Sequence, residues 1–496
     1  MTFLAQLVVL GSTLLAPVPK QRGIDPGTIA ECEKLGAVYG TMRTLSNGRI
    51  EFVAAADHPA AVGLPAFHIR RPLLKDKLPE IPEPFGLMVT GDAGYLGYCS
   101  GARNLTSVVM NCHAFARAGF EELADLPNLK HLRIVRANAL KDDALMWISG
   151  FKKLESLDLH TNTNFTRKAR RELIDLKKLE VLLLPYVNFT LADLSWIADP
   201  EKIRSLALSC GGDRDFKVLE NFTRLQSLEF HCRHPESSSQ LTQTAFASLG
   251  ELRKLRRFVA DHARIAADCT ETIAGFAELE ELSLKDCPVS PAGLQKLAGM
   301  AYLTSLDLTG VHLLDGSLEP FTRITRLTIP GTPMNDRAGT VLSRFERLEY
   351  LDVSSNNNLP LSAYESIAKL PKLKSLNLDS TSVRDDTLKN LNCYPTLEEL
   401  NVRNTFATDE GIIALKGCKK LTYLHVENTK LTDACMPTLI RLPLRHVEMA
   451  RTGVTGKHLD EWLRSPTLIR VNLNATGVTP AEVKALEVAH PKRLFR

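Results

Sequence analysis

Apolar residues recur along this chain in one short pattern that repeats at a nearly constant distance. The segment LKSLNLDSTSVRDDTLKNL begins at Leu373, LEELNVRNTFATDEGIIAL follows at Leu397, and LTYLHVENTKLTDACMPTL follows at Leu421. Each reads L-x-x-L-x-L-x-x-T and then changes to the apolar spacing of a short helix. The same register gives sixteen copies with a mean period of about 24 residues, starting at 105, 129, 154, 179, 203, 225, 255, 279, 303, 324, 348, 373, 397, 421, 444 and 468.

This pattern predicts a stack of strand, turn and helix units. The apolar positions of L-x-x-L-x-L belong to a short strand, and 47 of the 48 such positions hold Leu, Ile, Val, Met or Phe, with Ala260 as the exception. One unit cannot bury its own apolar face, so stability must come from stacking against its neighbours. The predicted fold is an α/β solenoid with a curved parallel sheet of about sixteen short strands on its concave face. Short helices are expected on the convex face.

The residues after each predicted strand favour an ordered turn and a capped helix. The eighth residue after the first leucine is usually Asn, Thr or Cys, whose side chain can hydrogen-bond backbone groups of the turns. Thr479 with Glu482, and Ser362 with Glu365, have the spacing of capping boxes. Helices are therefore expected to begin at these positions.

The repeat resembles the leucine-rich repeat family over about four-fifths of the chain. Its subtype resembles the bacterial T-x-V-T-D form. It is also similar to the cysteine-containing repeats of F-box substrate receptors, because Cys287 is an eighth residue and Cys418 lies three residues before a leading leucine. The resemblance implies a leucine-rich-repeat solenoid with N- and C-terminal caps, whose inner, strand-lined face binds partners.

The chain divides into five segments around the repeats. Residues 1–23 contain a mostly apolar run and form a candidate signal peptide or leader, although the first lysine is Lys20; the alternative is a helix packed on the array. Residues 24–56 are expected to form an N-terminal cap of a helix plus a hairpin that turns at Ser46-Asn47-Gly48. Residues 57–104, which hold many prolines, are expected to form an irregular strap. The repeat array spans 105–479, and 480–496 should form a capping helix and a basic tail.

Composition narrows the functional classes. The 496 residues are 44% hydrophobic and 24% charged, as is usual for a soluble protein, and the net charge of +4 gives little support to a dedicated nucleic-acid binder. No apolar run is long enough for a membrane span. The ten cysteines show no C-x-x-C spacing, so neither a zinc ribbon nor a thioredoxin-like motif is expected. The compartment stays open between an exported and a cytoplasmic protein, with the leader favouring export.

One column of residues has the chemistry of a metal site. Just beyond four successive predicted strands, the chain holds Cys210, Cys232, His262 and Asp286, with His231 beside them. Stacked sulfur and imidazole groups could bind zinc, and the two cysteines could form a disulfide. An accidental column explains the same residues. We therefore assign no metal ligand, cofactor or catalytic residue.

The expected function is a non-enzymatic scaffold for protein–protein interaction, acting as a monomer on a protein partner and not on nucleic acid. Aromatic and arginine side chains are the commonest energetic anchors at interfaces. On the inner face they concentrate in the last seven repeats, where the candidate partner-binding residues are Tyr350, Arg403, Tyr423, His425, His446 and Arg451. The alternatives are a substrate-recognition subunit of an F-box-type ubiquitin ligase, which needs an F-box before the repeats, and a metal-dependent activity at the His/Cys column.

Overall fold

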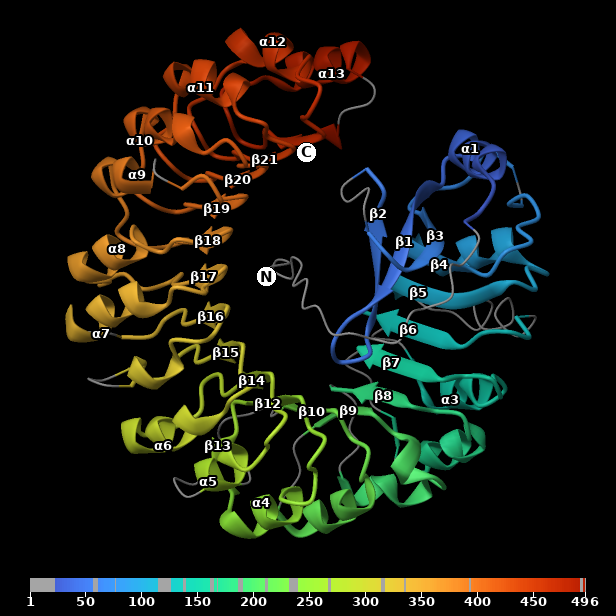
Figure 1. The fold of residues 1–496 in the computed structure, drawn as a ribbon. Helices are drawn as coiled ribbons and strands as arrows, with labels where there is room; N and C mark the ends of the chain where they lie inside the picture. Colours follow the sequence, from blue (N-terminus) through green and yellow to red (C-terminus); the bar gives the residue numbers. More distant parts are fainter. Residues whose placement is uncertain are drawn as a thin grey trace.

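The computed structural model describes residues 23–56, 61–75, 77–114, 126–136, 140–160, 165–166, 168–185, 191–209, 213–231, 240–265, 269–313, 317–333, 336–391, 394–490 and 494–495. The candidate leader lies almost wholly outside these residues. The chain forms a strongly curved solenoid with strands along its inner face and helices around its outer face (Figure 1).

Within the described residues, one sheet of 21 strands runs through the whole molecule. From the third strand onward, neighbours follow one another in chain order and pair in parallel. These strands are β3 (Leu64–Ile69), β4 (Phe85–Asp92), β5 (Leu105–Ala114), β6 (His131–Val135), β7 (Ser156–His160), β8 (Val181–Leu184), β9 (Ser205–Ser209), β10 (Ser227–His231), β12 (Arg257–Asp261), β14 (Glu281–Ser283), β15 (Ser305–Asp307), β16 (Arg326–Thr328), β17 (Tyr350–Asp352), β18 (Ser375–Asn377), β19 (Glu399–Asn401), β20 (Tyr423–His425), β21 (His446–Glu448), β22 (Arg470–Asn472) and β23 (Leu494–Phe495).

The sheet confirms the predicted register, including the stretch where the repeats are least regular. Leu228 of β10 pairs with Leu206 of β9 on one side and with Phe258 of β12 on the other, and all three are fourth residues of their copies. Leu400 pairs with Leu424 in the same way. A small second sheet pairs β11 (Gln240–Leu241), which lies between β10 and β12, with β13 (Arg264–Ile265), which follows β12.

The outer layer is built from short helices, one or two in each repeat whose outer segment the structure describes. Their apolar residues join the leucines of the strands in one continuous buried core along the solenoid. The α-helices of the array are α3 (Asp142–Ile148), α4 (Gln243–Leu249), α5 (Cys269–Ala274), α6 (Pro291–Lys296), α7 (Asp336–Val341), α8 (Leu361–Ile367), α9 (Asp385–Leu391), α10 (Asp409–Ala414), α11 (Met436–Arg441) and α12 (Leu459–Leu463). 3₁₀ helices take their place in several repeats, as at η2 (Ala169–Asp175), η3 (Leu191–Trp196) and η5 (Asp213–Asn221).

Threonine and aspartate side chains link successive turns in the C-terminal part of the solenoid. The backbone N and Oγ1 of Thr432 donate to the Asp409 carboxylate over 2.9 and 2.6 Å. Thr455 repeats both bonds to Asp433, over 2.8 and 2.6 Å. Asp409 and Asp433, each in the first turn of a helix, therefore satisfy polar groups at the start of the following helix, where donors lack partners within the helix.

The eighth residue after the first leucine of a copy hydrogen-bonds the backbone, as predicted. Oγ1 of Thr405 donates to the carbonyl of Val402 over 2.6 Å within one repeat. Sγ of Cys287 donates to the carbonyl of Ala260 over 2.9 Å, which lies in the preceding repeat. Thr and Cys thus satisfy buried carbonyls in the same part of successive turns.

The N-terminal segment contains the expected helix and hairpin, α1 (Pro26–Leu35), β1 (Val38–Thr44) and β2 (Ile50–Ala54). The expectation of an irregular strap over 57–104 was wrong, because β3 and β4 lie in that stretch and continue the parallel sheet. Phe67 pairs with Leu87, and Leu87 pairs with Val108 of the first predicted repeat. The prolines lie mostly at the edges of these strands and between them, where they remove few ladder hydrogen bonds.

At the other end, α13 (Pro480–Ala489) begins with the predicted capping box. Oγ1 of Thr479 accepts from the backbone N of Glu482 over 3.2 Å, and the Glu482 carboxylate accepts from the backbone N of Thr479 over 2.7 Å. The capping box predicted at Ser362 does not form. Helix α8 begins one residue earlier, after Pro360, and the Ser362 hydroxyl instead donates to the carbonyl of Asp336 in the preceding repeat over 3.0 Å.

Candidate functional site

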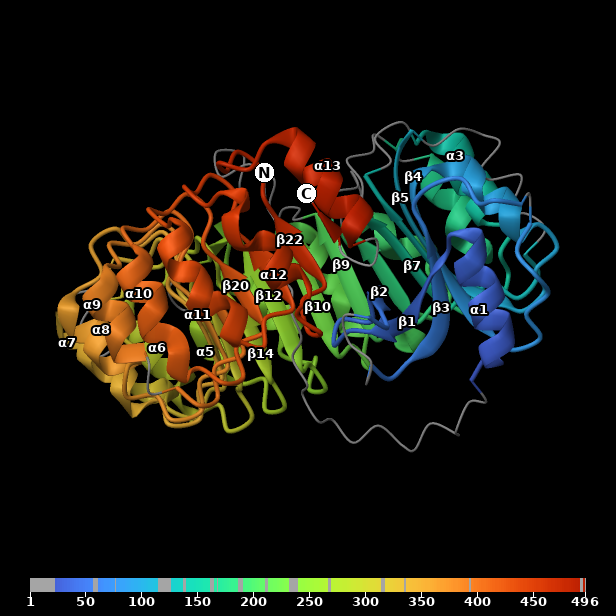
Figure 2. The ribbon, with the colours of Figure 1, turned by 90° about the horizontal axis from the view of Figure 1, so that it is seen from above.

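The β1–β2 hairpin folds back inside the curve of the solenoid and lies over the inner face of the first strands (Figure 1, Figure 2). On its strands, Met42 and Ile50 pack with Ala66 and Val109 in a small apolar cluster separate from the main core. At its tip, Gly48 has a φ of 76°, and a Cβ on this residue would lie 2.7 Å from Cγ2 of Val181. Both the positive φ and the close approach require glycine. The tip therefore rests directly on strand β8.

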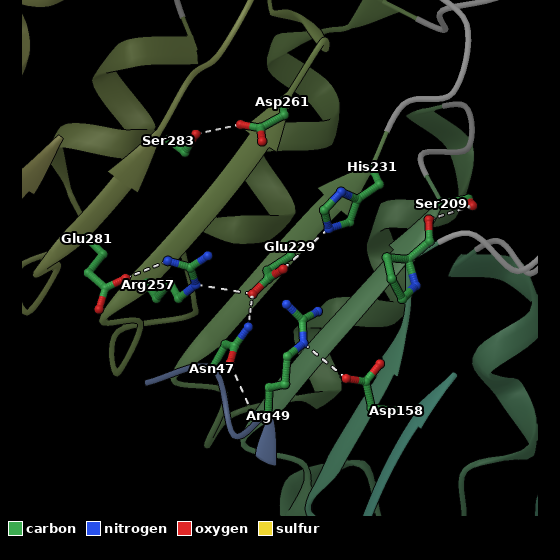
Figure 3. A network of polar contacts seen from close by, with 11 residues as sticks. Asn47, Arg49, Asp158, Ser209, Glu229, His231, Arg257, Asp261, Glu281 and Ser283 are labelled. Atoms are coloured by element: carbon green, nitrogen blue, oxygen red, sulfur yellow. Dashed lines mark hydrogen bonds and ion pairs between the residues drawn. The ribbon is translucent and has the colours of Figure 1, made fainter. Parts of the chain in front are cut away.

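A buried network of charged side chains joins the hairpin tip to β7, β10 and β12 (Figure 3). Nδ2 of Asn47 donates to Oε1 of Glu229 over 2.8 Å, and Nε of Arg49 lies 3.0 Å from Oδ2 of Asp158. Nε of Arg257 lies 3.1 Å from Oε1 of Glu229. The side chains of Asp158 and Glu229 are only 1% and 3% exposed. We call Asp158, Glu229 and Arg257, together with β8 beneath Gly48, the tip-binding surface.

The charges of this network set the protonation states of its neighbours. Burial by itself would raise the pKa of Glu229, but Arg257, and with it His231 and Arg49, lowers that pKa well below its ordinary value. Burial, and then the neighbouring Arg49, lowers the pKa of His160 to about 4. At neutral pH Glu229 is therefore ionised and His160 is neutral.

The low pKa of His160 predicts that acid destabilises the protein. Its ordinary pKa is 6.5, so between about pH 6.5 and pH 4 the unfolded chain binds a proton that the folded chain does not. Stability must therefore fall as the pH falls through this window. We expect the wild type to lose about 2 kcal/mol more of its unfolding free energy between pH 7 and pH 5 than a His160→Gln variant loses. Urea denaturation at both pH values measures the free energy of unfolding. Equal losses in the wild type and in His160→Gln would contradict the prediction.

Strands β15 to β22, which we call the open arc, face the interior of the curve opposite the hairpin (Figure 1). The two halves meet where the guanidinium of Arg445 donates to the carbonyl of Ala56, just beyond β2. The candidate residues on the inner face of this arc come from β17, β20 and β21, and Arg403 and Arg451 come from the turns after β19 and β21.

Tyr350 lies on the inner face of the open arc and is already in contact with a cation. The guanidinium carbon of Arg326, on the neighbouring strand, lies 3.5 Å from the centre of the Tyr350 ring. This is a cation–π contact. Burial raises the pKa of Tyr350, so its hydroxyl stays protonated. Beside it, Asp352 is nearly buried and accepts from Nδ2 of Asn377 over 3.0 Å.

Tyr423 and His446 stack on adjacent strands, and His425, on the same strand as Tyr423, lies between two carboxylates. The rings of Tyr423 and His446 stack with centroids 4.7 Å apart and planes within 10° of parallel. Nε2 of His425 lies 4.0 Å from Oε1 of Glu399, and its Nδ1 lies 3.9 Å from Oε2 of Glu427. Burial lowers the pKa of His425 although Glu399 and Glu448 oppose the shift, so the ring is neutral at pH 7. The group offers a half-buried aromatic surface bordered by carboxylates.

Arg403 and Arg451 lie at the edge of the inner face, where the strands end. The backbone N of Arg403 donates to Oδ1 of Asn401 over 3.0 Å. Arg451 is exposed and has a φ of 59°, and its backbone N donates to the carbonyl of Asn474 over 2.9 Å. Asn404 also has a positive φ at the same position of its own repeat. The turn geometry therefore presents Arg451 beside the inner face and not on a strand.

The structure adds charged residues that the search for aromatic anchors missed. Oε1 of Glu448 lies 3.4 Å from the guanidinium of Arg470, and its other oxygen accepts from Nδ2 of Asn472 over 2.6 Å. Oε2 of Glu399 accepts from the Ser375 hydroxyl over 2.8 Å. These residues occupy the third and fifth positions of successive copies. In the sequence, the charged residues that recur at these two positions of the repeat could have identified them.

Taken together, the inner-face positions of the open arc and its turns are slightly acidic. These positions hold six carboxylates and four guanidinium groups, whereas the chain as a whole has a net charge of +4. The charged residues are Asp307, Asp352, Asp379, Glu399, Glu427 and Glu448 against Arg326, Arg403, Arg451 and Arg470.

The His/Cys column does not form a metal site within the described residues, where no group of three or more metal-ligating side chains comes together. Cys210 and Cys232 lie outside those residues. His231 instead contacts Glu229, with 3.3 Å between Nε2 and Oε2, and Nδ1 of His262 lies 3.2 Å from Oδ2 of Asp286.

The comparisons with known proteins concern the fold. No protein-family model and no curated protein matches this chain. Similar solved structures include the internalin inlF from Listeria monocytogenes, at 21% identity over 65% of this chain and 82% of that chain with a TM-score of 0.38. The leucine-rich repeat protein LIC12759 from Leptospira interrogans has 15% identity over 84% and 89% of the two chains and a TM-score of 0.36. A complex of TLR13 with ssRNA13 has 16% identity over 78% and 62% and a TM-score of 0.46.

The geometry described above is that of a leucine-rich-repeat solenoid. Every described copy contributes a short parallel strand to the inner face, and the chain returns over a helical outer layer. In the described part of the chain, no helix combines the length and the apolar character that crossing a membrane requires.

Proposed function

We propose that this protein is a non-enzymatic interaction scaffold that binds a protein partner on the open arc. The observation that carries the proposal is the stack of Tyr423 on His446, held on adjacent strands and bordered by Glu448 and Arg403. Tyrosine supplies apolar contact area with few rotatable bonds, and parallel strands hold it in place before a partner arrives. Binding then requires little ordering of the surface.

The charge of the open arc favours a protein partner over nucleic acid. Nucleic-acid binding rests on neutralising phosphates with lysine and arginine, and here carboxylates outnumber guanidinium groups. A protein can supply both signs of charge and so match the mixed surface. The F-box alternative loses support, since β3 and β4 occupy the stretch before the predicted repeats where helices would be required.

The proposal predicts the effect of truncating two anchors. We expect the double change Tyr423→Ala with Arg403→Ala to weaken partner binding by at least about 2 kcal/mol, because it removes ring area and a group able to pair with carboxylates. The partner is first captured from the native host with the wild-type chain, and its affinity for each purified variant is then measured by calorimetry.

The matched control is Lys389→Ala on the outer face. Its ammonium lies 3.3 Å from Asp386 and 3.4 Å from Glu410, so the change removes an exposed ion pair and leaves the inner face intact. We expect unchanged affinity for this variant. A partner that tolerates the inner-face double change but is lost with Lys389→Ala would rule out binding on the open arc.

A further inference from the structure

The tip-binding surface holds the hairpin tip as it would hold a ligand. The tip itself is a compact turn, in which the backbone N of Gly48 donates to the carbonyl of Leu45 over 2.9 Å and that of Leu45 donates to the carbonyl of Arg49 over 2.8 Å. Oδ1 of Asn47 accepts from the backbone N of Arg49 over 3.1 Å. The turn therefore has its shape without the solenoid, and projects Asn47 and Arg49 onto the surface.

The hairpin is anchored independently of its tip. β1 pairs with β3 over five residue pairs, and Met42 and Ile50, on the hairpin strands, belong to an apolar cluster with Ala66 and Val109. The tip, in contrast, is held by polar contacts to Asp158 and Glu229. The tip can therefore leave its surface while the cap keeps its sheet and its apolar contacts. Because a buried carboxylate that loses its cation is costly, the surface favours an occupant that again supplies a guanidinium.

Charge balance shows what kind of group the surface requires. The solenoid itself provides three carboxylates, from Asp158, Glu229 and Glu281, and two guanidinium groups, from Arg133 and Arg257. Nε of Arg133 lies 3.1 Å from Asp158, and Arg257 bridges the other two carboxylates over 3.1 and 2.5 Å. The third guanidinium is supplied by the hairpin, at Arg49. Without it, one nearly buried carboxylate has too little opposite charge.

We propose that the tip-binding surface is a recognition site for an arginine-bearing β-turn, which the chain's own hairpin occupies and which a protein partner presenting such a turn takes over by displacing the tip. The site is separate from the open arc and does not rest on the function proposed there. Specificity comes from the guanidinium paired with Asp158, the amide paired with Glu229, and the flat approach over Val181 that only glycine permits.

The test presents the turn to the full-length chain as a separate molecule. The probe is a fluorescein-labelled, backbone-cyclised peptide of residues 43–51, and its matched control is the same peptide with Arg49→Ala. The receptor variant is Gly48→Val, whose side chain strains the positive φ and collides with Val181, so the resident tip is lifted while the surface itself is unchanged. Circular dichroism and gel filtration check that the array stays folded.

In fluorescence anisotropy, we expect the peptide to bind the Gly48→Val chain at least about tenfold more tightly than the wild type, whose surface is occupied. The Arg49→Ala peptide should bind that variant at least about tenfold more weakly than the native peptide. Should Gly48→Val fail to fold, the chain with Asn47→Ala and Arg49→Ala releases the tip without crowding Val181 and carries the same expectations. The proposal is overturned if the native peptide binds no variant better than the wild type, or if the alanine peptide binds as tightly.

Discussion

Replacing Glu229 by glutamine is expected to lower the free energy of unfolding by about 3–5 kcal/mol. The side chain is 3% exposed, and it is the carboxylate that balances Arg257 and receives the hydrogen bond from Asn47. Glutamine keeps the volume and one oxygen, so the loss isolates the charge. In the variant, the buried guanidinium of Arg257 keeps Glu281 as a close carboxylate but loses the charge of Glu229. Urea denaturation at pH 7, followed by circular dichroism, measures the difference.

Glu427→Gln on the open arc is the matched control for this charge removal. Burial raises the pKa of Glu427, so its folded environment disfavours the charge that the substitution removes. We expect a change within about 0.5 kcal/mol, or a small gain in stability. If Glu229→Gln and Glu427→Gln lowered the free energy of unfolding by similar amounts, the conclusion that Arg257 and Arg49 stabilise the charge of Glu229 would be wrong.

Leu400→Ala is expected to cost about 2–5 kcal/mol through the cavity that it leaves. Leu400 is fully buried and pairs with Leu376 and Leu424 on either side. The neighbouring Asn401 points to the inner face, where its side chain accepts one hydrogen bond from the backbone N of Arg403. Asn401→Ala should therefore cost about 0.5–1.5 kcal/mol. Thermal and urea unfolding of both variants test this difference, and equal costs would mean that inner and buried positions are exchanged.

The repeat array was predictable because its information is local and redundant. The pattern within each copy predicts the strand and turn of that copy. A slip of one residue would expose every buried leucine, so the sixteen copies together favour a single register. Strands β3 and β4 carry the same pattern, as Leu64-x-x-Phe67-x-Ile69 and Pro84-x-x-Leu87-x-Val89, but their prolines obscured it. A proline indicates irregular structure only where it removes a hydrogen bond between paired strands. Most of these prolines lie where no such bond is lost.

The candidate site was predictable in its positions but not in its contacts. Strand alternation placed Tyr350, Tyr423 and His446 on the inner face, because that geometry depends only on the register. It could not show that Arg326 lies on the ring of Tyr350, or that Tyr423 stacks on His446. Such pairs depend on which side chains of different repeats become neighbours and on the rotamers that packing leaves to them.

By itself, the sequence determined the solenoid, its register and the face that presents variable side chains, since each follows from a short pattern repeated along the chain. Only the tertiary structure decided that the N-terminal hairpin turns back into the curve and covers part of that face. Asn47 and Glu229 are 182 residues apart, and Arg49 and Asp158 are 109 apart. No local pattern encodes such pairs; they form because the stacked repeats bring buried carboxylates to the one place where the guanidinium of the hairpin can balance them.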